Sequence, residues 1–430
     1  MKITLGPDLI ECLSWSLYAN PIVLFREAIQ NSIDSFSSIS SDFSNLNIRI
    51  TLNNKERVIA ITDNGPGLGK DAFFKNLSSL GESTKKGKAQ AGCRGIGRIS
   101  GLGICDSIIF ESKHKSSNLI SSCTVNAKGI RNELSKPNNN SQKDIAEFLD
   151  PFFEFSKKDD SSNQSFFTVT YQNVRHTPAD FLLNPSLISK YISSVIPVTL
   201  ADSFPFREDI GNFYKQHNLP NDIQVSINGS QNVVRGVCPK SSKVQMSPNL
   251  VFECGQVKSP SSEEILGSFW FIHHDYLGAL EESPFRGLRF RHKNLLVGNE
   301  DTFSHLYKEP RFNRWTIAEI HPLSDRIRPS VKRDDFESSD EFSFFCSQLR
   351  PNLYKVSQLA RKSSITRQSI KDSKRHAFLL PEKKKLQGIL KRKLPSTVSR
   401  KRLIVIADRL LSHLQGRISA KDLSGFFTNK

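Results

Sequence analysis

The chain has 430 residues, of which 37% are hydrophobic and 30 are Phe, and this is enough for two or three domains with separate cores. No apolar run reaches the ~20 residues that cross a bilayer, and the N-terminus lacks the layout of a secretory signal peptide. Seven scattered cysteines form no CxxC pair, which argues against a disulfide framework or a zinc site and favours the cytoplasm.

The net charge of +17 is concentrated near the C-terminus. Residues 351–430 contain 20 Lys or Arg against 4 Asp or Glu, so the first 350 residues are close to neutral. We therefore expect an acidic partner to bind residues 351–430.

Residues 1–175 alternate between helical and strand patterns, and we expect an α+β domain in which an antiparallel or mixed sheet is backed by helices. Two of the strands form a predicted hairpin around Asn53-Asn54. The strand patterns cover Arg49–Leu52, Arg57–Thr62, Ser107–Ser112, Ile120–Val125 and Phe166–Tyr171.

Residues 180–345 form a second predicted domain with its own strands. Residues 350–430 form a third region, which we expect to contain a basic linker at residues 361–375 and then two short helical segments. The strand patterns of the second domain cover Ile223–Gly229, Val233–Val237, Gly267–His274, Gly287–Gly298 and Thr316–His321.

The first motif lies on a predicted helix, Pro21–Phe36. At 100° per residue, Glu27, Asn31 and Asp34 fall within about 60° of one another. By itself this polar stripe is also typical of an ordinary solvated helix face. The apolar residues of the opposite side are Ile22, Phe25, Ile29, Ile33 and Phe36.

Two glycine-rich motifs follow. Asp63-Asn64-Gly65-Pro66-Gly67-Leu68-Gly69 comes directly after a strand; its glycines allow close approach to a ligand, although a tight turn would use the same residues. Residues 81–87 and 92–100 then lead into a helix whose N-terminus could hold phosphate. This third motif is neither a Walker loop nor a dinucleotide-binding fingerprint.

Taken together, Glu-x3-Asn-x2-Asp, Asp-x-Gly-x-Gly and Gly-x-Gly, in this order, resemble the Bergerat ATP-binding fold of the GHKL superfamily, which includes gyrase, the ninety-kilodalton heat-shock chaperones, histidine kinases and MutL. The resemblance implies ATP and Mg²⁺ as ligands. Asn31 would coordinate the metal, and Glu27 would be the general base that activates water. Asp63 would hold the adenine.

The resemblance also assigns the rest of the nucleotide site. The mobile lid would be residues 81–94. Thr168 would close the adenine site on a late strand, but Phe167 stands where the family has Gly, and Thr170 is an alternative. The further residues expected at the nucleotide are Asp34, Gly67, Gly95, Ile96 and Gly97.

Within the superfamily, the histidine kinases do not fit, because the first histidine is His114 and no phosphoacceptor precedes the ATP motifs. The segment Arg314–Glu337 looks like the middle domain of the heat-shock chaperones, where a loop arginine precedes a helix. By position this arginine is Arg333, which would act as an arginine finger on the γ-phosphate. A surface pair with Asp334 or Asp335 is the alternative, and Lys332 and Arg328 are other candidates.

Three functions remain open at this stage. The first is a chaperone-like ATPase that remodels a protein client when nucleotide closes the lid and docks the middle domain. The second is a DNA-associated clamp ATPase, similar to MutL or the MORC proteins, with nucleic acid bound by residues 351–430. The third is a protein that binds nucleotide without turnover, which the presence of Glu27 disfavours. A homodimer is expected only from the resemblance.

Overall fold

The computed structural model describes residues 20–79, 100–136, 144–236, 249–280 and 285–393, and residue 405. The described residues divide into two compact units. The first contains the residues up to His274 together with Ala279–Val356, and the second contains Asp275–Gly278 and the residues from Ser357 onward.

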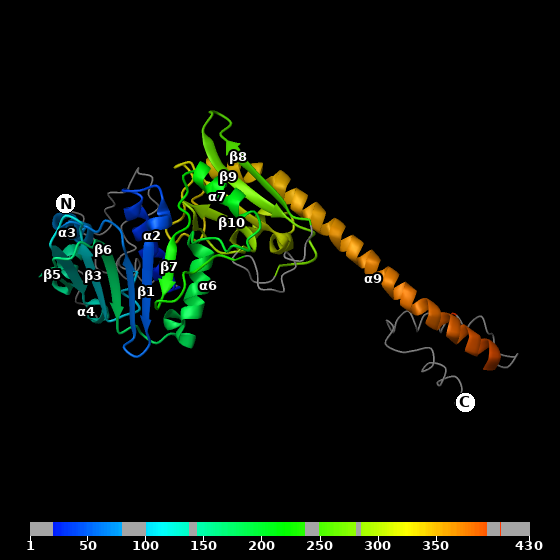
Figure 1. Ribbon diagram of the computed structural model, residues 1–430, viewed down its shortest axis with the longest axis horizontal. Helices are drawn as coiled ribbons and strands as arrows, with labels where there is room; N and C mark the ends of the chain where they lie inside the picture. Colours follow the sequence, from blue (N-terminus) through cyan, green and yellow to red (C-terminus); the bar gives the residue numbers. More distant parts are fainter. Residues whose placement is uncertain are drawn as a thin grey trace. The chain divides into compact units, whose positions relative to one another are not determined.

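A seven-stranded mixed sheet forms the N-terminal part of the first unit (Figure 1). Its order is β5-β4-β3-β6-β2-β1-β7, and every neighbouring pair is antiparallel except β1 and β7. The predicted hairpin is confirmed, since β1 pairs with β2. The strands are β1 (Asn47–Asn53), β2 (Val58–Asp63), β3 (Ser107–Lys113), β4 (Leu119–Val125), β5 (Phe153–Asp159), β6 (Phe166–Gln172) and β7 (Gln224–Ile227).

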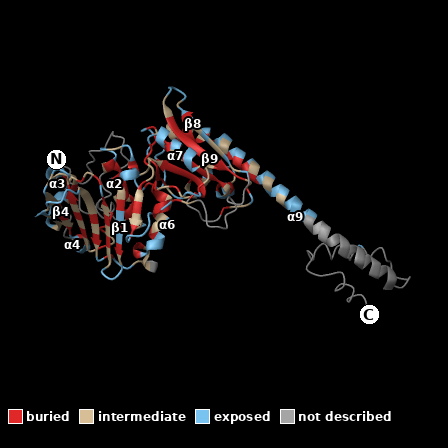
Figure 2. Cartoon of the chain, viewed as in Figure 1, coloured by how far each residue is buried: buried red, intermediate tan, exposed pale blue. Residues whose placement is uncertain are grey.

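Helices cover one face of this sheet. Burial alternates along β1 and β2, so that one face lies in the core and the other stays partly exposed (Figure 2). The core face packs against apolar side chains of the helices, which is the two-layer α+β arrangement expected from the sequence. The helices that contribute to this core are α2 (Val23–Phe36), α3 (Lys70–Ser78), α4 (Ala127–Leu134), α5 (Ile145–Leu149) and α6 (Pro185–Val195).

A five-stranded sheet, in the order β11-β10-β12-β9-β8, follows in the same unit. Its three inner strands are the ones that the sequence predicts. One predicted strand of this block, however, joins the first sheet, because β7 pairs in parallel with β1. The strands are β8 (Val251–Lys258), β9 (Ile265–His273), β10 (Gly287–His292), β11 (Leu295–Leu296) and β12 (Ile317–Pro322), and the helices of this part are α7 (Arg207–Gln216) and α8 (Asp340–Gln348).

Short 3₁₀ helices join several of these elements. They are η2 (Phe43–Asn45), η4 (Asp150–Phe152), η5 (Pro178–Leu183), η6 (Thr302–Leu306) and η7 (Pro310–Trp315).

The predicted basic linker at residues 361–375 is wrong. These residues lie inside α9 (Arg350–Lys393), a single helix of 44 residues. Pro351 stands in its first turn, where no backbone N–H is needed, and neither Gly nor Pro follows until Pro381. The long basic side chains in between have good helix propensity. Among the described residues, no helix has the length and apolar character needed to span a membrane.

Candidate functional site: a nucleotide pocket between α2 and the strand β2

Helix α2 carries the first motif. Glu27 is nearly buried, with 12% of its side chain exposed, Asp34 is buried, and Asn31 is exposed between the buried residues Gln30 and Ser32. The helix is therefore packed around more of its circumference than a simple amphipathic pattern predicts. Asn31 can reach a ligand in solvent, and Glu27 lies one turn before it.

Asp63 ends β2 and faces α2. Its Oδ2 accepts a hydrogen bond of 2.6 Å from the hydroxyl of Ser32, and its Oδ1 accepts one of 2.9 Å from the backbone N–H of Gly65. Burial raises the pKa of this carboxyl, and these hydrogen bonds act in the opposite direction. The backbone N–H of Phe167 acts in the same direction as these two donors. A carboxylate has about four acceptor sites, so it can still accept one further donor such as an exocyclic amine.

The glycine loop after β2 lies close to neighbouring backbone. Gly67 has a φ of +64°, and a Cβ placed there would lie 1.9 Å from the carbonyl oxygen of Lys113. The hydroxyl of Ser112 accepts a hydrogen bond from the N–H of Leu68 and donates one to the carbonyl of Phe166. The loop is thus held against the ends of β3 and β6, in a conformation that only glycine adopts easily at position 67.

A side chain at Gly65 would also disturb the site. Its Cβ would come within 2.8 Å of Asp63 Oδ1. Glycine at this position therefore avoids crowding the carboxylate oxygen.

The structure does not bring Thr168 to Asp63. Residues paired across an antiparallel ladder share a face, and Asp63 pairs with Phe167, whereas Thr168 pairs with Thr62. The two threonine hydroxyls lie 2.9 Å apart, on the face of the sheet away from α2. Thr170 lies on that same face, opposite Ala60. The late-strand residue at the pocket is therefore Phe167.

Two site residues were missed in the sequence, Ser32 and Phe167. Ser32 follows Asn31 directly and could have been found by asking which helix position faces the end of β2. Phe167 could have been found only from the register of β2 against β6, which the sequence does not state.

A contact between residues 306 positions apart connects α2 to the loop after β12. The guanidinium of Arg26 lies 3.2 Å from Glu27 Oε1 and 3.4 Å from the carbonyl oxygen of Lys332. Arg26 is buried, with 6% exposed. Arg26 therefore contacts both the Glu27 carboxylate, which is the candidate catalytic group, and the loop that carries Arg333.

Arg333 itself is buried, with 9% exposed and a φ of +55°. Its positive charge contributes, after burial, to lowering the pKa of His292 to about 3. The alternatives Lys332 and Arg328 are exposed. A helix follows this arginine in the chain, but α8 begins only at Asp340, after a Ser339 side chain that caps it.

The glycines expected at the phosphates, Gly95 and Gly97, lie outside the described residues, together with Ile96 and the lid at residues 81–94. Their assignment stays a prediction. The residue types fit a nucleotide with its metal, because the exposed residue Asn31 carries an amide oxygen, a ligand type that Mg²⁺ accepts, and Asp63 carries a buried carboxylate acceptor.

Comparison with known proteins gives matches in this part of the chain. Residues 23–159 match the family model described as Histidine kinase-, DNA gyrase B-, and HSP90-like ATPase. The chaperone protein HtpG of Acinetobacter baylyi is 32% identical over 128 residues, which are 25% of this chain and 20% of that protein. HtpG of Buchnera aphidicola is 34% identical over 93 residues, 19% of this chain and 15% of that protein.

HtpG of Chlorobium phaeobacteroides is 30% identical over 129 residues, 25% of this chain and 21% of that protein. The match thus spans about a fifth of the length of these relatives. The family model covers Glu27, Asn31 and Asp63, whereas Thr168 and Arg333 lie beyond it.

Proposed function

We propose that residues 23–159, which match the Histidine kinase-, DNA gyrase B-, and HSP90-like ATPase model and are similar to part of the HtpG chaperones, form an ATPase domain, and that the chain binds and hydrolyses ATP to remodel a protein client. The observation that carries the proposal is the buried Asp63 carboxylate beside Gly65, where any side chain would crowd its Oδ1. A buried carboxylate is retained where its charge or its acceptor capacity is used.

Each residue of the pocket has a role in this proposal. Asp63 accepts a hydrogen bond from the adenine amine, and Gly67 gives the loop its close approach. Mg²⁺, held by Asn31, neutralises charge on the phosphates when it is bound. Glu27 orients the attacking water and accepts its proton, and Arg26 holds the Glu27 carboxylate in place.

Arg333 supplies the second cation. Its loop lies against α2 through the carbonyl of Lys332, so a small shift of the loop could bring the guanidinium to the γ-phosphate. There it would stabilise charge that develops on the transferred group. Closure of a lid at residues 81–94, docking of the following domain, and a cytoplasmic homodimer belong to the same proposal and rest on the resemblance.

Calorimetry with a non-hydrolysable ATP analogue and Mg²⁺ tests the site. We expect binding by the wild type, loss of binding in Asp63→Asn, and retained binding without turnover in Glu27→Ala. Arg333→Ala should also bind and should lose about 10³-fold in kcat. Full binding by the Asp63 variant would show that the nucleotide lies elsewhere, and normal turnover by Glu27→Ala would remove its role as a base.

Client remodelling has a separate test. ATP-dependent recovery of a heat-denatured model enzyme should require the wild-type chain and should fail with Glu27→Ala. Recovery that is equal with both proteins would leave an ATPase without a chaperone cycle.

A second candidate, a DNA-associated clamp ATPase, is favoured by one feature of the chain. Residues 350–393 hold 14 Lys or Arg against 2 acidic residues, and they form the single helix α9. Stimulation of ATP turnover by duplex DNA at low salt, lost at high salt, would favour this candidate over the chaperone-like one.

A further inference from the structure

Helix α9 is long and strongly basic, and both properties suit the binding of a polyanion. At about 1.5 Å per residue, its 44 residues extend over roughly 66 Å. Its 14 basic and 2 acidic residues place one cation about every three residues along this length. Phosphates in double-helical DNA recur at roughly 1.7 Å along the axis, so many of these cations can find a phosphate at once.

The described side chains of this helix are largely open to solvent. Between Arg361 and Ser373, every residue is exposed except Ser363 and Arg367. Those two hold a loop of the same unit, since the hydroxyl of Ser363 donates to the carbonyl of Asp275 at 2.8 Å and Arg367 donates to the carbonyl of Tyr276. The remaining basic side chains of this stretch, including Lys362 and Lys371, are exposed and within reach of a partner.

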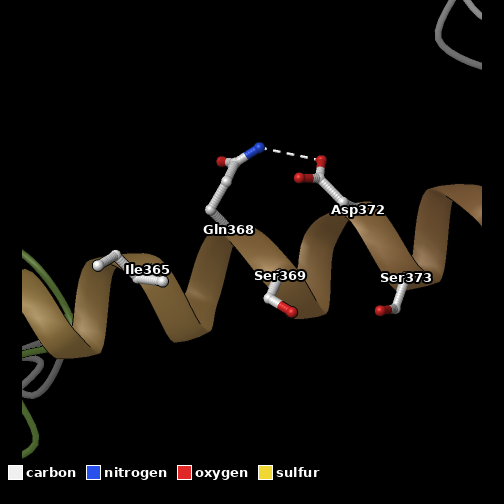
Figure 3. Close-up of a pocket in the computed structure, with 5 residues that line it drawn as sticks. All are labelled: Ile365, Gln368, Ser369, Asp372 and Ser373. Atoms are coloured by element: carbon white, nitrogen blue, oxygen red, sulfur yellow. Dashed lines mark hydrogen bonds between the residues drawn. The ribbon is translucent and has the colours of Figure 1, made fainter.

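A shallow depression on this stretch offers no enclosed site. Figure 3 shows that all five of its lining side chains project from one part of α9, between Ile365 and Ser373. Within it, Gln368 donates a hydrogen bond of 2.9 Å to Asp372, the single acidic residue of α9 before Glu382. A partner of this helix is therefore an extended surface rather than a small molecule.

Charge repulsion works against the isolated helix. Arg367 and Lys371, and then Lys371 and Arg375, are like charges four residues apart, an arrangement that destabilises a helix. Between Arg361 and Ser373 nearly every residue is exposed, and a helical stretch that is polar and solvated on most sides needs another source of stability. A polyanion would supply it by neutralising these charges.

Among the described side chains between Arg361 and Ser373, the distribution of apolar residues favours nucleic acid over a membrane. Ile365 and Ile370, both exposed, lie about 140° apart around the helix at 100° per residue. A membrane-surface helix gathers its apolar residues on one side. Aromatic residues, on which single-stranded bases stack, number two in α9, Tyr354 and Phe378. The phosphates of a double helix remain as the matching partner.

We propose that α9 binds the phosphate backbone of double-helical nucleic acid without sequence preference, and that this binding stabilises it as a helix. The inference rests on the second candidate function, for which it identifies the binding surface and the form of the nucleic acid. It does not depend on ATP binding.

Fluorescence anisotropy of a labelled 20-base-pair duplex with the full chain tests the proposal. We expect an affinity that falls steeply with salt, with a log–log slope of about −5 if about six cations meet phosphates, and equal binding of two unrelated sequences. Circular dichroism at 222 nm should show a gain in helix when duplex is added. A variant with five lysines of α9 neutralised should bind at least about tenfold more weakly and with a smaller slope. The substitutions are Lys362→Gln, Lys371→Gln, Lys374→Gln, Lys383→Gln and Lys384→Gln.

A matched control removes the same charge elsewhere. All five of its lysines are exposed, and we expect its affinity to stay within about twofold of the wild type, while thermal unfolding shows that both variants are folded. The control substitutions are Lys55→Gln, Lys115→Gln, Lys128→Gln, Lys158→Gln and Lys308→Gln.

Each other outcome overturns the inference in a distinguishable way. Equal loss in both variants would show an effect of net charge alone. If both variants bind duplex as strongly as the wild type, the second candidate function would remain possible, but the nucleic acid would bind away from α9. An absence of duplex binding at low salt would contradict both this inference and the second candidate function. Binding to vesicles with anionic lipid, but not to duplex, would assign α9 to a membrane surface. Calorimetry with ATP on the same protein reports independently on the nucleotide site.

Discussion

Asp63 keeps internal hydrogen-bond donors from Ser32, Gly65 and the backbone of Phe167 although its carboxylate is buried. The hydroxyl of Ser32 at 2.6 Å and the N–H of Gly65 at 2.9 Å stabilise the charged form, while burial raises the pKa of the group. The balance between these effects decides whether a charged acceptor is present for the adenine at a given pH. Ser32 is therefore part of the proposed pocket without touching the nucleotide.

Ser32→Ala should weaken nucleotide binding in a pH-dependent way. Without this donor the pKa of Asp63 rises further, so its carboxylate becomes protonated, and the affinity for an ATP analogue falls, at a higher pH than in the wild type. Loss of a hydrogen bond to a charged group should also lower the free energy of unfolding by about 1.5–3 kcal/mol. Calorimetric titrations between pH 5 and pH 8 measure the first effect. Ser38→Ala, at an exposed hydroxyl after the same helix, should match the wild type; identical pH profiles for all three proteins would contradict the role of Ser32.

Gly67→Ala should disrupt the loop. The positive φ is unfavourable for alanine by about 1–2 kcal/mol, and the added Cβ would collide with the backbone of Lys113. We expect at least about 2 kcal/mol of lost stability and no measurable ATP binding. Gly69→Ala is the matched control, because a Cβ at Gly69 meets nothing within 4 Å, and its loss should stay below about 1 kcal/mol. Equal thermal unfolding of the two variants would refute this account.

For single residues, the sequence predicted the residue types of the site better than the directions in which their side chains point. Asp63 and the helical residues Glu27 and Asn31 follow from spacing along a single element. Thr168 was placed at the pocket from its position on a late strand, yet a shift of one residue turns a side chain to the other face of a sheet. Only the pairing of β2 with β6 shows that Phe167 faces the pocket.

The elements of the second sheet enclose a buried ionic cluster. Glu319 on β12 lies 3.0 Å from Arg235 and 3.4 Å from Arg291, and it accepts a hydrogen bond of 2.7 Å from the hydroxyl of Tyr214. The two cations hold the pKa of Glu319 well below its usual value against the opposing effect of burial. The stability that this shift provides is therefore present above pH ~4.5 and is lost as the pH falls through the lowered value.

Glu319→Gln should leave buried cations without a counter-charge. Breaking a buried ion pair from one side costs about 3–5 kcal/mol, and urea unfolding near neutral pH measures it. Glu300→Gln removes a carboxylate that is 38% exposed beside Arg286, for which we expect no more than about 1 kcal/mol. If both variants have a similar midpoint of urea unfolding, the buried cluster contributes no more to the stability than an exposed ion pair does.

Most strands with alternating or continuous apolar residues were predicted from the sequence, although the predicted strand at Val233–Val237 forms only an isolated bridge at Arg235 among its described residues. The edge strands β5 and β8 were missed. β5 reads FEFSKKD, and four of its seven residues are charged; such charges are common at sheet edges, where they prevent further pairing, and they hide the strand from a hydrophobic pattern. The opposite error produced the linker at residues 361–375, since a dense basic sequence was taken as irregular although it contains no helix-breaking residue.

Across the whole first unit, the sequence could not predict the contact between Arg26 and the loop at Lys332. Arg26 stands next to Glu27 in the first motif, but its second partner is a backbone carbonyl 306 residues away. Every residue has a backbone carbonyl, so no sequence pattern shows which one accepts this hydrogen bond. This contact is nevertheless the feature that brings the candidate base and the candidate arginine finger into one assembly.

Arg26→Gln should separate ATP binding from turnover. The shorter amide cannot hold Glu27 Oε1 and the Lys332 carbonyl together, so the base loses its orientation and the loop loses its attachment to α2. Small misplacements of a catalytic group reduce rates steeply; we expect kcat to fall about tenfold or more while the affinity for an ATP analogue, which depends on Asp63 and the glycine loop, changes less than about twofold. Steady-state turnover and calorimetry on the same preparation measure both quantities.

Arg49→Gln is the matched control for Arg26, because Arg49 is exposed on β1 and its loss changes the net charge equally. Its kcat should equal that of the wild type. If the double variant loses no more kcat than Arg333→Ala alone, the two arginines act through one structural connection, as the shared loop implies. Losses that multiply would instead mean that Arg26 acts on Glu27 alone, and unchanged turnover in Arg26→Gln would mean that its contact with the loop has no part in catalysis.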